Sequence, residues 1–194
     1  MVIKEAKFIT SVAESGKFYN DGRPIIAVSG KSNVGKSSLI NMLANRKKLA
    51  KTSVTPGRTR LVNYFDFGAF VLADLPGYGF AKVPKSEKDK WAKLLEDFFA
   101  TQKITLLLSL SDIRHEPTAE DKQMINYLYH YAIPFIVVAT KADKLPKTKV
   151  KPQISYIAAA LYLGADNVIC SSAEKGTGKN EIFCAIEKAI AVKQ

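Results

Sequence analysis

Short apolar runs alternate with longer segments of helical period along the 194 residues of this chain. A brief apolar run bounded by turn residues is typical of a buried strand, and strands that alternate with helices predict parallel α/β units. Only the second and third predicted strands are close enough to form a hairpin, with Gly68 at its turn. The predicted strands are residues 24–29, 61–67, 69–73, 104–110, 134–139 and 167–170.

Helices are predicted between these strands, at residues 35–45, 86–101, 118–131, 150–163 and 178–192. The last one carries an apolar stripe from Ile182 to Ile190 at i, i+3, i+4, i+7 and i+8, which would pack on a sheet. Thr118 and Asp121 resemble a capping box. We therefore expect one three-layer α/β domain over residues 1–194, with a mostly parallel six-stranded sheet, one antiparallel edge hairpin and about five flanking helices.

Composition adds one unusual feature, a net charge of +11. The cations cluster, and the segment from Arg46 to Arg60 holds six of them and no acid. A polyanionic partner and a merely solubilising surface both fit this charge. Two cysteines, which we expect to be unreactive and buried, form no disulfide framework, and the N-terminus lacks a signal-peptide pattern. We expect a cytoplasmic monomer without a membrane anchor.

The most specific motif is a phosphate-binding loop that follows the first predicted strand and opens the first helix. It matches G-x-x-x-x-G-K-[ST], a pattern whose glycines let successive amides point at phosphate oxygens. Lys36 would reach the β and γ phosphates, and Ser37 would supply a hydroxyl ligand for Mg²⁺. The loop consists of Gly30, Lys31, Ser32, Asn33, Val34, Gly35, Lys36 and Ser37.

Three later motifs indicate which nucleotide is bound and what senses it. Asp74 and Gly77 form a D-x-x-G segment, in which Asp74 would hold Mg²⁺ through water and the Gly77 amide would meet the γ-phosphate. Thr140, Lys141 and Asp143 form a variant of N-K-x-D, whose carboxylate accepts from the N1–H and amino group of guanine, donors that adenine lacks. The loop expected behind the base is Ser171, Ser172 and Ala173.

A segment rich in Thr, Gly and Arg lies between the first two motifs. We interpret Gly57, Arg58 and Thr59 as part of a nucleotide-dependent switch, and we choose Thr59 over Thr55 as the threonine that completes the Mg²⁺ coordination. The order of these motifs, and above all D-L-P-G-Y-G-F-A from Asp74 onward, resembles the EngB (YihA/YsxC) family of bacterial GTPases, in the group that also contains TrmE, Era and EngA. The match covers residues 24–175, flanked by an N-terminal extension over residues 1–23 and the C-terminal helix.

The resemblance implies a Ras-like fold, GTP hydrolysis with Mg²⁺, and a role in assembly of the large ribosomal subunit linked to cell division and septation. Catalysis would depend on Lys36, Thr59 and Gly77, which position the phosphates and stabilise charge. Tyr78 stands where Ras-type enzymes carry a glutamine, so we expect slow turnover and a packing or partner-binding role for Tyr78. Asn33 is a candidate for binding K⁺, as in similar GTPases that lack this glutamine.

Two alternatives stay open at the sequence level. A P-loop ATPase or nucleotide kinase would not need Asp143, and an RNA-binding module with a non-functional phosphate loop would bind RNA equally with GTP or GDP. A basic membrane-surface protein would need an amphipathic anchor helix that the sequence lacks. His115 and His130 have no other metal-ligating residues at a suitable spacing and are predicted to be surface polar residues.

Overall fold

The computed structural model describes residues 3, 5–14, 16–50, 61–78 and 85–192 of the chain. Its strands and helices alternate as the apolar pattern predicts, and most boundaries agree with the prediction within one or two residues. The strands are β1 (Lys7–Val12), β2 (Ile25–Gly30), β3 (Val62–Asp66), β4 (Val71–Asp74), β5 (Ile104–Asp112), β6 (Phe135–Thr140) and β7 (Val168–Cys170). The helices are α1 (Lys36–Leu43), α2 (Lys85–Thr101), α3 (Ala119–His130), α4 (Lys147–Ala160) and α5 (Lys179–Ala191), with short 3₁₀ turns at Ala142–Lys144 and Ala165–Asn167.

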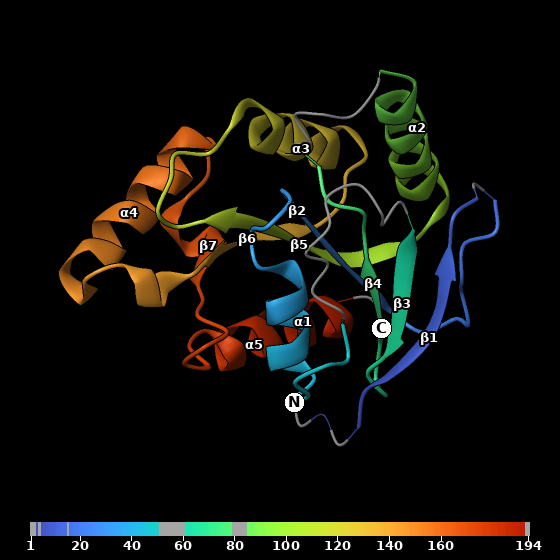
Figure 1. Ribbon diagram of the computed structural model, residues 1–194, viewed down its shortest axis with the longest axis horizontal. Coiled ribbons are helices and arrows are strands. Elements are labelled where there is room, and N and C mark those ends of the chain that lie inside the picture. The colour runs from blue at the N-terminus through green and yellow to red at the C-terminus, as the bar shows by residue number, and fades with distance from the viewer. Residues whose placement is uncertain (1–2, 4, 15, 51–60, 79–84, 193–194) are drawn as a thin grey trace.

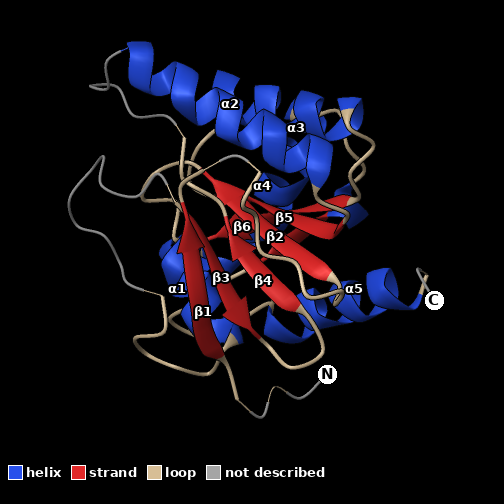
Figure 2. Cartoon of the chain, turned by 90° about the vertical axis from the view of Figure 1, so that its right-hand side faces the viewer, coloured by secondary structure: helices blue, strands red, loops and turns tan. Residues whose placement is uncertain are grey.

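The seven strands of the described residues join one sheet in the order β1-β3-β4-β2-β5-β6-β7. Neighbours from β4 through β7 pair in parallel, whereas β3 runs antiparallel to both β1 and β4. The expected six-stranded sheet is therefore wrong by one strand, because β1 extends it from within the N-terminal extension. The hairpin of β3 and β4 exists, but it lies one position inside the edge, which β1 occupies (Figure 2).

Helices cover both faces of the sheet (Figures 1 and 2), and an apolar core lies between the sheet and the helices on each face. One core contains side chains from α2, α3 and α4, and the other contains side chains from α1 and α5. The central strand β2 is buried along its whole length, as expected for a parallel strand covered on both faces. Ile182 and Ile186 of the predicted stripe are fully buried in α5, so its predicted packing is confirmed. The α/β class and the three-layer Ras-like architecture follow from this arrangement.

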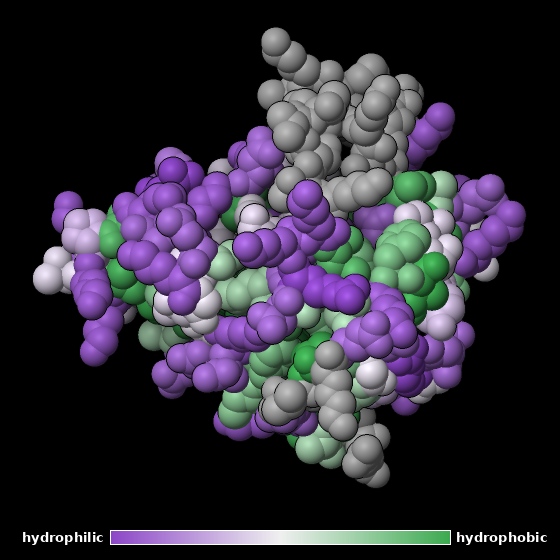
Figure 3. Space-filling model, turned by 60° about the horizontal axis from the view of Figure 1, so that its bottom comes forward, coloured by the Kyte–Doolittle hydropathy of each residue, from purple (hydrophilic) through white to green (hydrophobic). Residues whose placement is uncertain are grey.

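Local features support some predictions and correct others. Thr118 caps α3 as predicted, with the Asp121 side chain accepting the Thr118 amide at 2.8 Å. Cys170 is partly buried, but Cys184 is exposed, so the expectation that both thiols are buried is wrong. No helix in the described ranges is long and apolar enough to cross a membrane. Hydrophilic side chains cover much of the face in Figure 3, with smaller apolar areas between them.

Candidate nucleotide site

The predicted phosphate loop connects the end of β2 to the start of α1, so it lies at the carboxyl edge of the parallel strands. This edge is where open α/β sheets place their ligands. Asn33 and Gly35 both have positive φ, 64° and 107°, which coils the loop between the two elements. Gly30 is required for a different reason, since a Cβ there would lie 2.8 Å from Val34 Cγ1 and 2.9 Å from Leu110 Cβ. The loop is therefore built for close approach of its backbone.

Lys36, the first residue of α1, forms an ion pair with Asp74 at the end of β4. Both side chains are largely buried, with 15% and 8% of their surfaces exposed. Asn63 of the neighbouring strand lies 3.5 Å from the second carboxylate oxygen of Asp74. The structure thus brings together the lysine and the carboxylate that the sequence assigns to phosphate and to Mg²⁺. Gly35 stands at the N-cap of α1 and has no side chain to cap the helix, so the first amides of α1 are available for an anion.

The D-x-x-G segment lies directly against the phosphate loop. The Ser32 amide donates to the Tyr78 carbonyl at 2.9 Å, and the Tyr78 amide donates to the Gly30 carbonyl at 3.3 Å. A Cβ on Gly77 would lie 3.4 Å from the Gly30 oxygen, so this crossing is close. The two predicted phosphate-sensing segments therefore share a backbone ladder, and displacement of one changes the hydrogen bonds of the other.

The side chain of Tyr78 points away from this ladder and into the interface with α3. Only 4% of the residue is exposed, and its hydroxyl donates to Asp121 Oδ1 at 2.7 Å. Burial, and then the charge of Asp121, raises the Tyr78 pKa well above its usual value. This geometry confirms that Tyr78 packs, while the expectation that it is not a catalytic base stays a prediction. Asp121 was missed as a site-linked residue, and its capping-box position was the only sequence signal for it.

The predicted base-recognition residues meet the phosphate loop at the end of β6. Thr140 is buried, and its hydroxyl lies 2.7 Å from the Val34 carbonyl and 3.1 Å from the Ser111 carbonyl. Lys141 has a positive φ of 60° and donates to the Asn33 carbonyl at 2.7 Å. Thr140 therefore ties this segment to the phosphate loop, even though it replaces the usual asparagine.

Asp143 lies in the 3₁₀ turn that follows and is oriented by the last predicted loop. The Ser172 hydroxyl donates to Asp143 Oδ1 at 2.7 Å, and Lys144 lies 3.1 Å from the other oxygen. The Ser172 bond is the main cause of a lowered Asp143 pKa, so the carboxylate stays ionised at neutral pH. The Ser171 carbonyl accepts the Ala142 amide at 3.0 Å. The two loops thus form one unit around an acceptor of fixed charge.

Asp112, at the end of β5, was not identified from the sequence. It lies 2.9 Å from the Lys141 ammonium and accepts two hydrogen bonds from the Arg114 guanidinium. Burial alone would raise the Asp112 pKa, but the bonds from Arg114 and Lys141 outweigh it and hold that pKa well below its usual range. Asp112 therefore positions Lys141 across the loop. Its place directly after an apolar strand was the signal that could have found it.

The remaining predicted residues fall into two groups. Gly57, Arg58 and Thr59, with Thr55, lie outside the described residues. His115 and His130 are exposed, as the surface prediction requires. The described residues therefore bring the phosphate-loop, D-x-x-G and base-recognition segments together at one edge of the sheet.

Comparison with known proteins agrees with this arrangement. Residues 25–141 match the family described as 50S ribosome-binding GTPase. A protein of Geobacillus kaustophilus (strain HTA426), described as a probable GTP-binding protein EngB, is 42% identical over 194 residues, which covers 98% of this chain and 100% of that protein.

Solved structures show the same fold. One, described as a probable GTP-binding protein engB, superposes with a TM-score of 0.72 at 22% identity over 86% of this chain and 98% of its own. Another is Era in complex with MgGDPNP and nucleotides 1506–1542 of 16S ribosomal RNA, with a TM-score of 0.65 and 25% identity over 86% of this chain and 56% of Era.

Proposed function

Because the chain is a GTPase that belongs to the 50S ribosome-binding GTPase family and to the EngB GTP-binding proteins, we propose that it acts as a nucleotide-dependent switch in assembly of the large ribosomal subunit. The meeting of Lys36, Asp74 and the base-recognition segment at one edge of the sheet supports the nucleotide part of this proposal, and the match to the 50S ribosome-binding GTPase family supports its ribosomal part. We further propose that residues 1–194 form a single G domain, since β1 joins the same sheet as the motif-bearing strands and α5 packs against it. A cytoplasmic location is a separate proposal that follows from the family resemblance.

Phosphate binding would use the groups that now pair within the site. Lys36 would move its ammonium from Asp74 to the β and γ phosphates, while the amides of residues 31–37 and Gly77 would donate hydrogen bonds to the phosphate oxygens. Lys36, Gly77 and the predicted Thr59 are the proposed catalytic residues. The Tyr78 side chain is held by its hydrogen bond to Asp121, so it does not orient the attacking water as the glutamine of Ras-type enzymes does. Slow turnover by the isolated protein follows from this.

The donors near Lys36 fit a magnesium ion. Ser37 offers a hydroxyl, a hard oxygen ligand of the kind that Mg²⁺ prefers, Asp74 offers a carboxylate that would hold the ion through water, and Thr59 is the proposed third residue. When bound, Mg²⁺ would neutralise charge on the β and γ phosphates. The ion pair that Lys36 makes shows that the Asp74 carboxylate already faces the phosphate loop. Gly57 and Arg58 are proposed to belong to the same switch.

Guanine recognition would depend on Asp143. Its carboxylate would accept from the base, Ser172 and Ala173 would lie behind the ring, and Lys141 and Thr140 would hold the phosphate loop beside it. A site built around an ionised acceptor rejects adenine, because the carboxylate would be left unpaired. This reasoning disfavours the ATPase alternative.

Potassium is a separate proposal that rests on Asn33. This residue is exposed at the turn of the phosphate loop, and its carbonyl is fixed by Lys141. A K⁺ ion held by Asn33 would supply positive charge near the transferred phosphoryl group, a role that an arginine finger fills elsewhere. Turnover should therefore be faster in KCl than in NaCl at equal ionic strength, and equal rates would remove K⁺ from the account.

The ribosomal role is testable by sedimentation. Purified protein is layered with ribosomal subunits in GDP, in a non-hydrolysable GTP analogue, and without nucleotide. Co-migration with the large subunit only in the triphosphate state supports a switch. Equal co-migration in all three states would favour the alternative of an RNA-binding module with a non-functional phosphate loop, and no co-migration would contradict the proposed partner. A link to cell division and septation is a further expectation of the family resemblance.

A further inference from the structure

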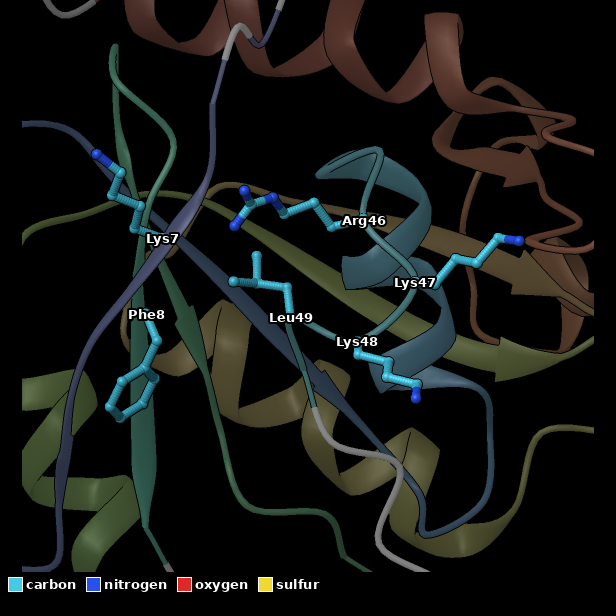
Figure 4. A pocket seen from close by; sticks show the side chains of 6 residues that line it. All are labelled: Lys7, Phe8, Arg46, Lys47, Lys48 and Leu49. Carbon is cyan, nitrogen blue, oxygen red and sulfur yellow. The ribbon is translucent and has the colours of Figure 1, made fainter.

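An open hollow of about 690 Å³ lies between β1 and the loop that follows α1, and most of its lining residues are basic (Figure 4). It lies away from the predicted nucleotide contacts, at the other end of α1 from Lys36. Four of its lining residues are cations and the other two are apolar, and none is acidic. The lining consists of Lys7, Phe8, Arg46, Lys47, Lys48 and Leu49.

Most of this charge is not neutralised by the described part of the protein. Lys7 forms an exposed ion pair with Glu5 at 3.0 Å. Arg46, Lys47 and Lys48 are exposed and form no ion pair with any described residue. Three adjacent cations without a counter-ion among the described residues favour an anionic partner. A row of phosphates spaced along a polymer fits them better than one isolated anion does.

The loop that carries these cations is held in place by α1. The Asn41 side chain makes two bonds to the backbone of Ala50, donating to its carbonyl at 2.9 Å and accepting from its amide at 2.8 Å. The Arg46 amide donates to the Asn41 carbonyl at 2.9 Å. Both ends of the loop are therefore fixed to the same helical residue. Cations on a fixed loop lose less conformational entropy on binding than cations on a free one.

An aromatic side chain lies beside the cations. Phe8 is 53% exposed, which is unusual for a large apolar residue, and its ring meets Phe65 edge-on with centroids 5.8 Å apart. The contact with Phe65 supports the ring and leaves much of its surface open. Proteins that bind single-stranded nucleic acid combine such aromatic surfaces with basic grooves, because bases stack on the ring while cations track the backbone.

We propose that this basic hollow binds a single-stranded RNA segment, with its phosphates against Arg46, Lys47 and Lys48 and a base against Phe8. The proposal rests on the proposed ribosomal role and identifies the surface that would contact RNA. RNA fits better than a membrane, because four of the six lining residues are cations and only one ring is exposed, whereas insertion into a bilayer needs a broader apolar face.

The test compares two variants of equal charge change. Arg46, Lys47 and Lys48 are replaced by Gln in one variant, and Lys147, Lys149 and Lys151 in the other. The control lysines are exposed on α4, which packs beside β7 at the opposite end of the sheet from β1 (Figure 1). Binding of a fluorescent 15-nucleotide single-stranded RNA is measured by anisotropy at several salt concentrations. Melting temperature and basal GTP turnover should be unchanged in both variants, since no catalytic group is altered.

The hollow variant should lose about a hundredfold in affinity at 0.1 M salt, and its salt slope should fall by about 2, or about 0.7 for each lost phosphate contact on a single strand. The α4 variant should change far less. Phe8→Ala should cost about tenfold without changing the salt slope, because stacking releases no counter-ions. Asn41→Ala should also weaken binding while leaving the charge intact.

Equal losses in the two charge variants would overturn the proposal, because binding would then follow net charge and not this surface. No measurable RNA binding by the unaltered protein would overturn it as well. So would a hollow variant that loses affinity for vesicles containing anionic lipid while keeping its affinity for RNA. The same variant separates this proposal from the ribosomal role. If the hollow variant still co-migrated with the large subunit, the ribosomal role would stand and this RNA surface would be refuted.

Discussion

The bond between the Tyr78 hydroxyl and Asp121 Oδ1 predicts a specific stability loss in Tyr78→Phe. Tyr78 is only 4% exposed, and the substitution keeps its ring. It removes only the hydroxyl oxygen, which lies 2.7 Å from the Asp121 carboxylate. Asp121 also accepts the Thr118 amide at 2.8 Å, and the substitution leaves this part of the α3 capping box intact. The variant therefore isolates one hydrogen bond between the D-x-x-G segment and α3.

A hydrogen bond to a charged group contributes about 1.5–3 kcal/mol, and burial on both sides places this one in the middle of that range. A loss of about 2 kcal/mol corresponds to a fall in melting temperature of about 4–8 °C for a chain of this size. The raised Tyr78 pKa adds a pH signature. Because the folded protein favours the neutral phenol, the contribution of the Tyr78 hydroxyl to stability is complete below about pH 10 and is lost as the pH rises further.

Urea unfolding at pH 7, followed by fluorescence or circular dichroism, measures the free-energy difference directly. Tyr129→Phe is the matched control, since Tyr129 lies on α3 with 59% of its surface exposed, and its loss should stay within about 0.5 kcal/mol. A double-mutant cycle with Asp121→Asn should show strong non-additivity. GTP turnover should remain within a few-fold of that of the unaltered protein.

Two results would refute this reasoning. If Tyr78→Phe unfolded at the same urea concentration as the unaltered protein, the hydrogen bond would not stabilise the fold. If turnover fell by more than about a hundredfold without loss of structure, Tyr78 would be taking part in proton transfer, contrary to its buried position.

Three further outcomes are expected. Gly30→Ala should lose about 2 kcal/mol of stability in urea unfolding and weaken GDP binding, because its Cβ would meet Val34 and Leu110 at under 3 Å, whereas Gly164→Ala, whose nearest contact is 3.4 Å, should be neutral; equal behaviour would contradict the crowding argument. Thr140→Val should weaken GDP binding by about 1–3 kcal/mol, because it removes the hydroxyl that lies 2.7 Å from the Val34 carbonyl of the phosphate loop. Unchanged GDP affinity by calorimetry would show that this hydrogen bond is dispensable. Asp112 has a lowered pKa, so the ionised carboxylate stabilises the fold above about pH 4 and this stabilisation is lost as the pH falls. The unaltered protein should therefore lose more stability between pH 7 and pH 3 than Asp112→Asn does. Parallel stability curves against pH would contradict this role for Asp112.

The fold followed from the sequence where periodicity is strong. The buried strand β2 and the apolar stripe of α5 each leave a clear pattern, and their positions were predicted within a residue or two. The edge strand β1 left none, since its residues are only exposed or partly buried and its register with β3 shifts between Phe8 and Thr10. Such a bulge breaks the two-residue alternation by which a strand is identified, and the partner strand is distant in sequence.

The candidate site shows the same division. Gly30, Lys36 and Asp74 stand in motifs whose spacing is fixed by phosphate geometry, so their convergence could be predicted. Asp121 and Asp112 act on site residues only through tertiary contacts, with Tyr78 and Lys141 respectively. No spacing rule connects those pairs, because their separation depends on how α3 and β5 pack.

Base selection by Asp143 is the most direct test of the whole account. Affinities for GDP, XDP and ADP are measured by calorimetry with Mg²⁺ for the unaltered protein and for Asp143→Asn. The account predicts GDP binding by the unaltered protein with little ADP binding, and a shift of more than about a hundredfold from GDP toward XDP in the variant, since two hydrogen bonds to a charged group are exchanged. Unchanged GDP affinity in the folded variant would contradict it.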